Sequence, residues 1–311
     1  MNLYAQKVNN FKIAKPVLKW AGGKSLLLPQ LSQHFPNKLK CGAVKRYIEP
    51  FVGSGAVFFE IFNTYYFKEA YLLDTNPELI ILYKVIQQDV NDLIKILEQL
   101  QNIYLSTPEQ KQFYYQIREE YNGFDKDIKT EKYQKSFIRR AALTIFLNKT
   151  CFNGLFRVNS KGLFNVPMGK YKNPKILNKT NLKAVSEALQ YATIIQADFS
   201  TALNYMDQDT FVYYDPPYRP IKTSSFNSYT TNTFDDNEQY RLKALFDKGN
   251  NLGALQMLSN SDPTNFNRND LFFDKLYGNY KINRIWAKRL INATPDGRGV
   301  VRELLITNYE S

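Results

Sequence analysis

The chain has very little histidine and cysteine. Its 311 residues include one histidine, His34, and two cysteines, Cys41 and Cys151, that lie far apart in the sequence. Zinc and other transition metals are usually held by several such side chains, so this scarcity argues against a metal site. Two distant cysteines do not make the dense disulfide framework of a small secreted domain, which favours a reducing, cytoplasmic setting.

Long apolar runs are absent as well. No stretch of 18 apolar residues occurs, so the sequence predicts no membrane-spanning helix and no membrane partner. The first twenty residues lack the apolar core of a secretory signal. With 44% hydrophobic residues, the chain is long enough to bury one large core or two modest ones.

Acidic residues are missing from residues 132–186. The whole chain has 29 of them and a net charge of +12, yet this segment has none. Aromatic side chains are interleaved with its cations, which are Lys132, Lys135, Arg139, Arg140, Lys149, Arg157, Lys161, Lys170, Lys172, Lys175, Lys179 and Lys183. A solvated basic face is one interpretation. A surface that binds nucleic acid fits better, because neutralising phosphates requires many cations on one side of a protein.

Strands and helices are predicted to alternate at both ends of the chain. The apolar patterns indicate strands at 45–52, 70–74, 192–199, 210–215, 254–259 and 302–310. They indicate helices at 56–67, 77–100, 107–122, 132–150, 181–190 and 235–249. The alternation predicts an α/β fold with a mostly parallel, helix-covered sheet, built from residues 1–87 and 186–311. Residues 88–185 then form a mainly helical insertion.

A glycine turn follows the first predicted strand. Gly53 and Gly55 lie in the stretch YIEPFVGSGAVFFE, and Asp74 ends the next strand. Glycines at such a turn let a ligand approach the backbone, and an acid about 20 residues further on suits ribose hydroxyls. Phe58 occupies the place of the third glycine in the dinucleotide pattern. This favours a nucleoside cofactor without a pyrophosphate, such as S-adenosylmethionine, although an ordinary tight turn with a capping Asp74 remains an alternative.

The stretch DPPY ends the buried strand predicted at 210–215. Asp215 supplies a carboxylate, Pro216 a backbone carbonyl held rigid by two prolines, and Tyr218 a ring for stacking. The exocyclic amine of a base is a poor nucleophile, and two acceptors for its N–H groups free its lone pair. Acceptors placed in advance where charge develops give a large catalytic effect. The alternative is a proline-stopped strand with an exposed aromatic side chain.

Three motifs together carry a resemblance to a family. KWAGGK at 19–24, EPFVGSG at 49–55 and DPPY at 215–218 resemble the Dam-type adenine-N6 DNA methyltransferases, the D12 class, in the order of their alpha group. Residues 148–175, with FNGL and FNVP, are similar to the target-recognition segment of the DpnII-type GATC modification methylases. The similarity covers almost the whole chain. It implies a Rossmann-like, S-adenosylmethionine-dependent methyltransferase sheet with an inserted target-recognition domain.

The resemblance implies roles for residues at the cofactor. Asp74 would hold the ribose hydroxyls, Asp198 would accept from the adenine amine, and Trp20 with Lys24 would border the methionine end. The implied catalytic residues are Asp215, Pro216 and Tyr218. The implied cofactor residues are Trp20, Lys24, Glu49, Phe51, Gly53, Gly55, Asp74, Asp198 and Asp215.

The resemblance also implies a set of DNA contacts. Arg157 matches a position that reads guanine, and Phe152 matches an aromatic residue that inserts where the adenine leaves the stack. The family often has tyrosine there, so a phosphate contact by its hydroxyl would be lost. The implied DNA-binding residues are Lys19, Phe152, Asn153, Leu155, Arg157, Pro167 and Lys170.

The function implied is methyl transfer from S-adenosyl-L-methionine to N6 of adenine in double-stranded DNA, within GATC, by base flipping and without a metal. The role implied is modification beside a separate restriction endonuclease. A solitary Dam-like methylase with another adenine-containing target and an inactive DNA-binding relative are the alternatives. Related turns also methylate protein amides or RNA, whereas Phe58 and DPPY argue against a nicotinamide oxidoreductase.

Overall fold

The computed structural model describes residues 13–219, 234–288 and 300–310. The chain divides into two compact units. The first unit consists of residues 1–23, 53–64 and 74–196, and the second consists of residues 24–52, 65–73 and 197–311. Within the described residues, no helix is both long and apolar enough to cross a membrane.

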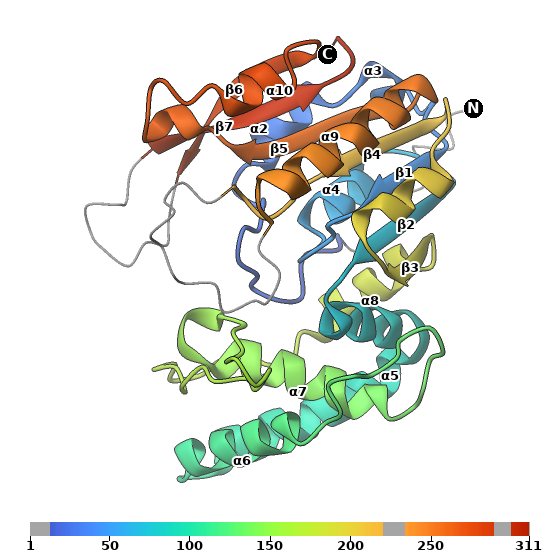
Figure 1. Ribbon diagram of the computed structural model, residues 1–311. Helices are drawn as coiled ribbons and strands as arrows, with labels where there is room; N and C mark the ends of the chain where they lie inside the picture. Colours follow the sequence, from blue (N-terminus) through green and yellow to red (C-terminus); the bar gives the residue numbers. More distant parts are fainter. Residues whose placement is uncertain (1–12, 220–233, 289–299, 311) are drawn as a thin grey trace. The chain divides into compact units, whose positions relative to one another are not determined.

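Seven strands form one sheet in the order β3-β2-β1-β4-β5-β7-β6 (Figure 1). Their bounds are β1 (Arg46–Glu49), β2 (Glu69–Asp74), β3 (Ala192–Gln196), β4 (Thr210–Tyr214), β5 (Leu255–Ser261), β6 (Lys281–Lys288) and β7 (Val300–Thr307). β1 is parallel to β2 and β4, and β4 is parallel to β5. β7 runs antiparallel to both β5 and β6. The mainly parallel sheet confirms the predicted Rossmann-like α/β class.

The sheet of the second unit has a topological switch point between β1 and β4. From β1 the strand order proceeds to β2, and from β4 it proceeds to β5. Ligands of open α/β sheets bind outside the carboxyl ends of the strands at such a point. Glu49 is the last residue of β1, and Asp215 directly follows β4. The fold therefore places two predicted site carboxylates at the position where this class binds ligands.

Burial explains why β4 is rigid. All five of its residues are buried, which suits a central strand covered on both faces. Its two tyrosines keep their hydroxyl groups satisfied inside the protein. Tyr213 shares a hydrogen bond of 2.7 Å with Ser259, and Tyr214 donates to Gln256 Oε1 at 2.7 Å. Both partners lie in β5, so the strand that carries Asp215 is held to its neighbour by side chains as well as by the backbone ladder.

The remaining elements of the second unit are short, apart from one helix. α9 begins after Asp235, whose side chain accepts from the backbone N–H groups of Asn237 and Glu238. This is a standard N-cap interaction. The helical elements are α2 (Leu28–Leu31), η1 (Ser32–His34), α3 (Asn37–Lys40), η3 (Phe199–Tyr205), α9 (Asp236–Asn251), η4 (Pro263–Asn265) and α10 (Phe272–Leu276).

Helices make up most of the first unit. They are α4 (Ala56–Thr64), α5 (Pro77–Ser106), α6 (Gln110–Asn122), α7 (Phe137–Thr150), η2 (Phe152–Gly154) and α8 (Lys179–Leu189). α5 begins with Asn76 as its N-cap, because the Asn76 side chain accepts from Glu78 N at 2.9 Å and Pro77 suits the first helical position. α7 is apolar around most of its surface and packs against α5 and α6.

Several element boundaries differ from the sequence predictions. α5 continues to Ser106, so Thr107 ends this helix instead of starting the next one, and α6 begins at Gln110. α7 begins at Phe137 rather than at 132. The strand β6 was not predicted, because an edge strand with mixed polar and apolar residues lacks a periodic apolar pattern. The predicted domain boundaries, with an insertion at 88–185, stay a prediction.

Candidate active site

Asp215 forms an ion pair with Lys24. The Nζ of Lys24 lies 2.6 Å from Asp215 Oδ1, and the two side chains are 4% and 19% exposed. Burial raises the pKa of Asp215 above its ordinary value, although the charge and hydrogen bond of Lys24 act in the opposite direction. Both residues were predicted at the cofactor, and Asp215 also as a catalytic residue, but a direct contact between them was not predicted.

Tyr218 lies in the same cluster. The Lys24 ammonium is 4.8 Å from the centroid of the Tyr218 ring, and the Tyr218 hydroxyl donates to Glu303 Oε2 at 2.8 Å. Burial raises the pKa of Tyr218 well above its usual range, and the charges of Asp215 and Glu303 add to this shift. The hydroxyl therefore stays protonated and fixes the ring. Sequence reasoning missed Glu303, for which the only signal was one acid at the start of an apolar strand.

The next residue, Arg219, anchors the DPPY turn on its far side. Its guanidinium binds Asp236 through Nε at 2.6 Å and Asp270 through Nη1 at 2.9 Å. It also lies 4.2 Å from the centroid of the Phe272 ring. Pro216 is buried between the two anchors. The turn is thus held at both ends, which keeps the Asp215 carboxylate and the Pro216 carbonyl in place.

Three further predicted cofactor residues belong to the second unit. Glu49 is 2% exposed and accepts from the Tyr47 hydroxyl at 2.7 Å. Phe51 stacks on Phe199 with the ring centroids 5.3 Å apart. Asp198 precedes Phe199 directly, so Phe51 and Asp198 are brought to one place in the second unit.

Asp198 is held as a carboxylate by several partners. It accepts from Ser200 N at 3.0 Å and forms an ion pair with Arg241 at 2.9 Å. Burial acts to raise the pKa of Asp198, but the Ser200 hydrogen bonds and the Arg241 charge outweigh it and the pKa is lowered. An ionised acceptor beside an aromatic ring is an arrangement that can bind an aminated heterocycle.

The glycine turn belongs to the first unit. Gly53 and Gly55 adopt φ angles of +47° and +71°, which explains the choice of glycine at both positions. Asp74 accepts from Gly53 N at 3.0 Å through Oδ2 and from Asn76 N at 2.9 Å through Oδ1. Burial raises the pKa of Asp74, while these backbone donors act to lower it. Asp74 therefore lies at the glycine turn and organises it, as the alternative of a capping aspartate describes. Its role at ribose hydroxyls stays a prediction.

Apart from Lys19, the predicted DNA-binding residues gather in residues 151–170 of the first unit, which we call the folded-back loop. Residues 151 and 168 form an antiparallel bridge, and so do residues 158 and 164. Phe152 N donates to Pro167 O at 2.9 Å, and Arg157 Nε donates to Asn165 Oδ1 at 2.8 Å. Phe152 is 50% exposed, and Arg157 and Lys170 are also exposed. Asn153 has a φ of 55°, which turns the chain just before Gly154 and Leu155.

Lys19 and Trp20 reach this loop from the N-terminal segment. The Lys19 ammonium lies 5.5 Å from the centroid of the Tyr171 ring. Trp20 stacks on Phe156 with the ring centroids 5.2 Å apart. Burial lowers the pKa of Lys149, and the charge of Lys19 adds to this effect. Two cations near each other, one of them in the acid-free segment 132–186, suit a surface that meets phosphates.

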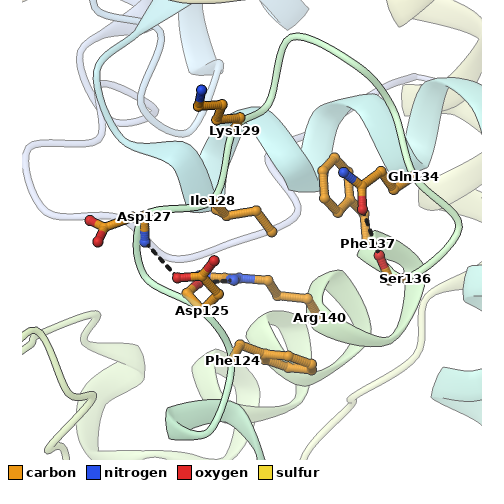
Figure 2. A pocket seen from close by; sticks show the side chains of 9 residues that line it. All are labelled: Phe124, Asp125, Asp127, Ile128, Lys129, Gln134, Ser136, Phe137 and Arg140. Atoms are coloured by element: carbon orange, nitrogen blue, oxygen red, sulfur yellow. Dashed lines mark hydrogen bonds between the residues drawn. The ribbon is translucent and has the colours of Figure 1, made fainter.

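A cavity of about 490 Å³ lies elsewhere in the first unit, lined by the segment that connects α6 to α7 and by the first turn of α7 (Figure 2). It contains none of the predicted site residues. Figure 2 shows Arg140 reaching toward Asp125, and Arg140 Nη1 donates to the Asp125 carbonyl at 2.6 Å. Its lining residues are Phe124, Asp125, Asp127, Ile128, Lys129, Gln134, Ser136, Phe137 and Arg140.

Among the residues with described positions, no group of three or more His, Cys, Asp or Glu side chains could hold a metal ion.

Comparisons with known proteins show which family the chain resembles. Residues 20–291 match the model of the D12 class N6 adenine-specific DNA methyltransferase family. The type II methyltransferase M.MjaIII of Methanocaldococcus jannaschii is 47% identical, over 95% of this chain and 99% of that protein. The type II methyltransferase M1.LlaDCHI of Lactococcus lactis subsp. cremoris is 36% identical, over 99% of both. The DNA adenine methylase of Haemophilus influenzae is 32% identical, over 94% of this chain and 92% of that protein.

Proposed function

Since the chain belongs to the D12 class of N6 adenine-specific DNA methyltransferases, we propose that it transfers the methyl group of S-adenosyl-L-methionine to N6 of the adenine in GATC. The observation that carries the proposal is the cluster at the end of β4. There a largely buried carboxylate, a carbonyl between two prolines and a fixed aromatic ring are supplied by Asp215, Pro216 and Tyr218. This set matches the needs of an amine that must be made nucleophilic.

The residues present fit the proposed cofactor. Gly53 is partly exposed in a turn that its positive φ angle allows, and the Asp74 carboxylate accepts from its N–H. Gly55 is buried and packs against the Phe59 ring, so it shapes the turn from the inside. In the second unit, the Phe51 ring and the Asp198 carboxylate suit the adenine moiety. We assign Asp74 to the ribose hydroxyls, Asp198 to the adenine amine, and Trp20, Lys24 and Glu49 to the methionine end. When bound, the cofactor supplies a methyl group on a positively charged sulfur.

The chemistry of the DPPY residues follows from their hydrogen-bonding capacity. The lone pair of the adenine amine is delocalised into the ring. In our proposal Asp215 and the Pro216 carbonyl accept hydrogen bonds from the two N–H groups of this amine. The nitrogen then becomes tetrahedral, and its lone pair is free to attack the methyl group. Stacking on Tyr218 contributes roughly 1–3 kcal/mol. The nitrogen would gain the methyl group as the carbon–sulfur bond breaks and its electron pair stays on sulfur, and would then release one proton to solvent. Asp215 thus acts as a hydrogen-bond acceptor and is not required as a strong base.

DNA recognition is assigned to the first unit. Lysines and arginines of the folded-back loop contact phosphates, and the Arg157 fork reads the two major-groove acceptors of guanine. The adenine must leave the helix to reach the acceptors, which costs a few kcal/mol of stacking and pairing. We assign the exposed Phe152 ring to the space that the adenine leaves. Lys19, Asn153, Leu155, Pro167 and Lys170 complete the proposed contact set.

The relatives support a role in modification beside a restriction endonuclease, because two of them are named type II methyltransferases. The name DNA adenine methylase of another relative supports the alternative of a solitary enzyme.

Expression of the chain in cells that lack adenine methylation distinguishes GATC from other adenine-containing target sequences. We expect plasmid DNA to become resistant to an endonuclease that is blocked by N6-methylated GATC. Methylation mapped at a different adenine-containing sequence would contradict the GATC assignment, and no methylation would contradict the activity.

The ion pair between Lys24 and Asp215 predicts how the rate of methyl transfer depends on pH. Asp215 must be ionised to accept from the amine, so the rate is lost as pH falls through its raised pKa. Lys24→Met removes the charge that opposes this shift, so the pKa of Asp215 rises further. We expect the acid limb of the single-turnover rate, at saturating DNA and cofactor, to move to higher pH.

A matched control uses a second lysine–aspartate pair of the same unit. Lys45 pairs with Asp209, and these side chains are 55% and 36% exposed. Lys45→Met is expected to leave the acid limb where it is, because solvent screens an exposed pair. An acid limb that stays in place in Lys24→Met would show that a group other than Asp215 controls the rate at low pH.

A further inference from the structure

Three asparagine side chains hold residues 14–19 of the first unit. Each comes from a different helix and pairs with both the N–H and the C=O of one backbone residue, as a neighbouring strand would. Asn63 of α4 holds Ala14 at 3.1 and 2.9 Å, and Asn181 of α8 holds Lys15 at 2.9 and 2.9 Å. Asn148 of α7 holds Lys19 at 2.9 and 2.9 Å. The N-terminal segment is thus fixed by side chains in place of a β-ladder.

Asn148 differs from the other two in its third hydrogen bond. Its Nδ2 also donates to the carbonyl of Gly154 at 2.8 Å. Both N–H groups of the amide are therefore used, one on the N-terminal segment and one on the folded-back loop. The side chain is 1% exposed, so each of these bonds is shielded from water. A single buried amide connects Lys19 to the loop that carries the other proposed base contacts.

The packing around Gly154 also depends on where the folded-back loop lies relative to Lys19. Gly154 has a φ of +66°, and a Cβ there would lie 2.6 Å from Lys19 Cδ and 3.2 Å from the carbonyl of Asn148. The Lys19 side chain therefore passes directly over the glycine. If the loop moved relative to Lys19, these contacts would be lost together.

The next residue extends the connection to the glycine turn at the proposed cofactor site. Trp20 stacks on Phe156 of the folded-back loop. On another side, its Cδ1 lies 3.4 Å from the position of a Cβ at Gly53. Lys19 and Trp20 are adjacent, so the backbone that Asn148 fixes joins the folded-back loop to the turn at Gly53.

We propose that Asn148 is a positioning residue that sets base discrimination, by holding Lys19 and the folded-back loop in one register. This inference rests on the proposed function, because it takes Lys19 and Arg157 as residues that read the site. Discrimination requires that both meet their base edges at the same time. Loss of the Asn148 bonds lets one contact form without the other, so that altered sites lose less rate than the GATC site does.

The test compares Asn148→Leu with Asn181→Leu. Asn181 makes the same two bonds to the backbone of Lys15 but does not contact the loop in the hydrogen bonds described. The measured quantity is the ratio of kcat/KM for a GATC duplex to kcat/KM for duplexes with one base pair of the site changed. We expect the ratio to fall about 10-fold or more in Asn148→Leu, as for a lost base contact, and to change less than about twofold in Asn181→Leu.

The measurement separates failure of the proposed function from failure of the role proposed for Asn148. A wild-type chain that methylates no adenine, or all duplexes equally, would contradict the proposed function before any variant is considered. A wild-type chain that discriminates, with equal ratios in Asn148→Leu and wild type, would overturn the role of Asn148. If Asn148→Leu does not fold, Asn148→Asp serves instead, because it keeps the acceptor for Lys19 N–H and replaces the group that donates to both carbonyls. An unchanged ratio in a folded Asn148→Asp would overturn the proposal equally.

Discussion

Asp215→Ala is expected to lower the rate of methyl transfer by about 10³-fold while DNA binding persists. The carboxylate lies at the end of the fully buried strand β4 and is the acceptor assigned to the adenine amine. Its removal takes away an interaction that is strongest when the amine becomes tetrahedral, so kcat falls much more than affinity for DNA. Single-turnover kinetics with labelled cofactor measure the first quantity, and fluorescence anisotropy of a labelled duplex measures the second.

Two controls separate chemistry from folding. Asp209→Ala changes the aspartate that precedes β4, whose Lys45 pair is exposed, and is expected to keep the rate within about twofold. Asp215→Ala also deprives the buried Lys24 of a partner, and a Lys24→Met/Asp215→Asn double variant removes that charge imbalance. A double variant that folds, binds DNA and methylates at the wild-type rate would refute the role of the DPPY turn.

Arg140→Met is expected to lower the free energy of unfolding by about 3–5 kcal/mol, because it leaves the buried Glu78 carboxylate without its cation. The guanidinium of Arg140 in α7 binds Glu78 in the first turn of α5 through Nε, at 3.0 and 3.1 Å, and through Nη2. The side chains are 6% and 10% exposed. Urea unfolding followed by circular dichroism measures the change.

The neighbouring residue provides the matched control. Arg139 binds Glu120 through two hydrogen bonds of 2.7 Å, but this pair is 39% and 40% exposed. Arg139→Met is expected to cost no more than about 1 kcal/mol, since solvent screens exposed pairs. The double variant Glu78→Gln/Arg140→Met should recover part of the loss, because no buried charge remains. Equal costs for Arg139→Met and Arg140→Met would show that burial of the pair does not matter.

Sequence alone predicted the elements that carry local signals. Asp215 follows a mostly apolar stretch that two prolines end. Both the strand and the acid at its end could therefore be inferred. The glycine turn at Gly53 and Gly55 and the strand that ends at Asp74 could likewise be predicted, because a strand, a turn and an acid at a set spacing form a local pattern. The edge strand β6 has no such pattern and was missed.

Contacts between distant segments could not be inferred in this way. The Lys24–Asp215 pair joins two motifs that lie far apart in the sequence, and no spacing indicates that their side chains meet. Asn148 is one polar residue at the end of an apolar helix, and nothing in the sequence distinguishes it from an exposed asparagine. Glu303 depends on the antiparallel pairing of β7 with β5, which follows from the folded sheet.

We propose that this chain methylates adenine N6 within GATC. This is tested by methyl transfer from labelled S-adenosyl-L-methionine to two duplexes, one with a single GATC and one with GTTC in its place. After digestion to nucleosides, we predict label in the first duplex only, and only in N6-methyladenine. Label in both duplexes would contradict the GATC assignment, and label on another base or in neither duplex would contradict the proposed activity itself.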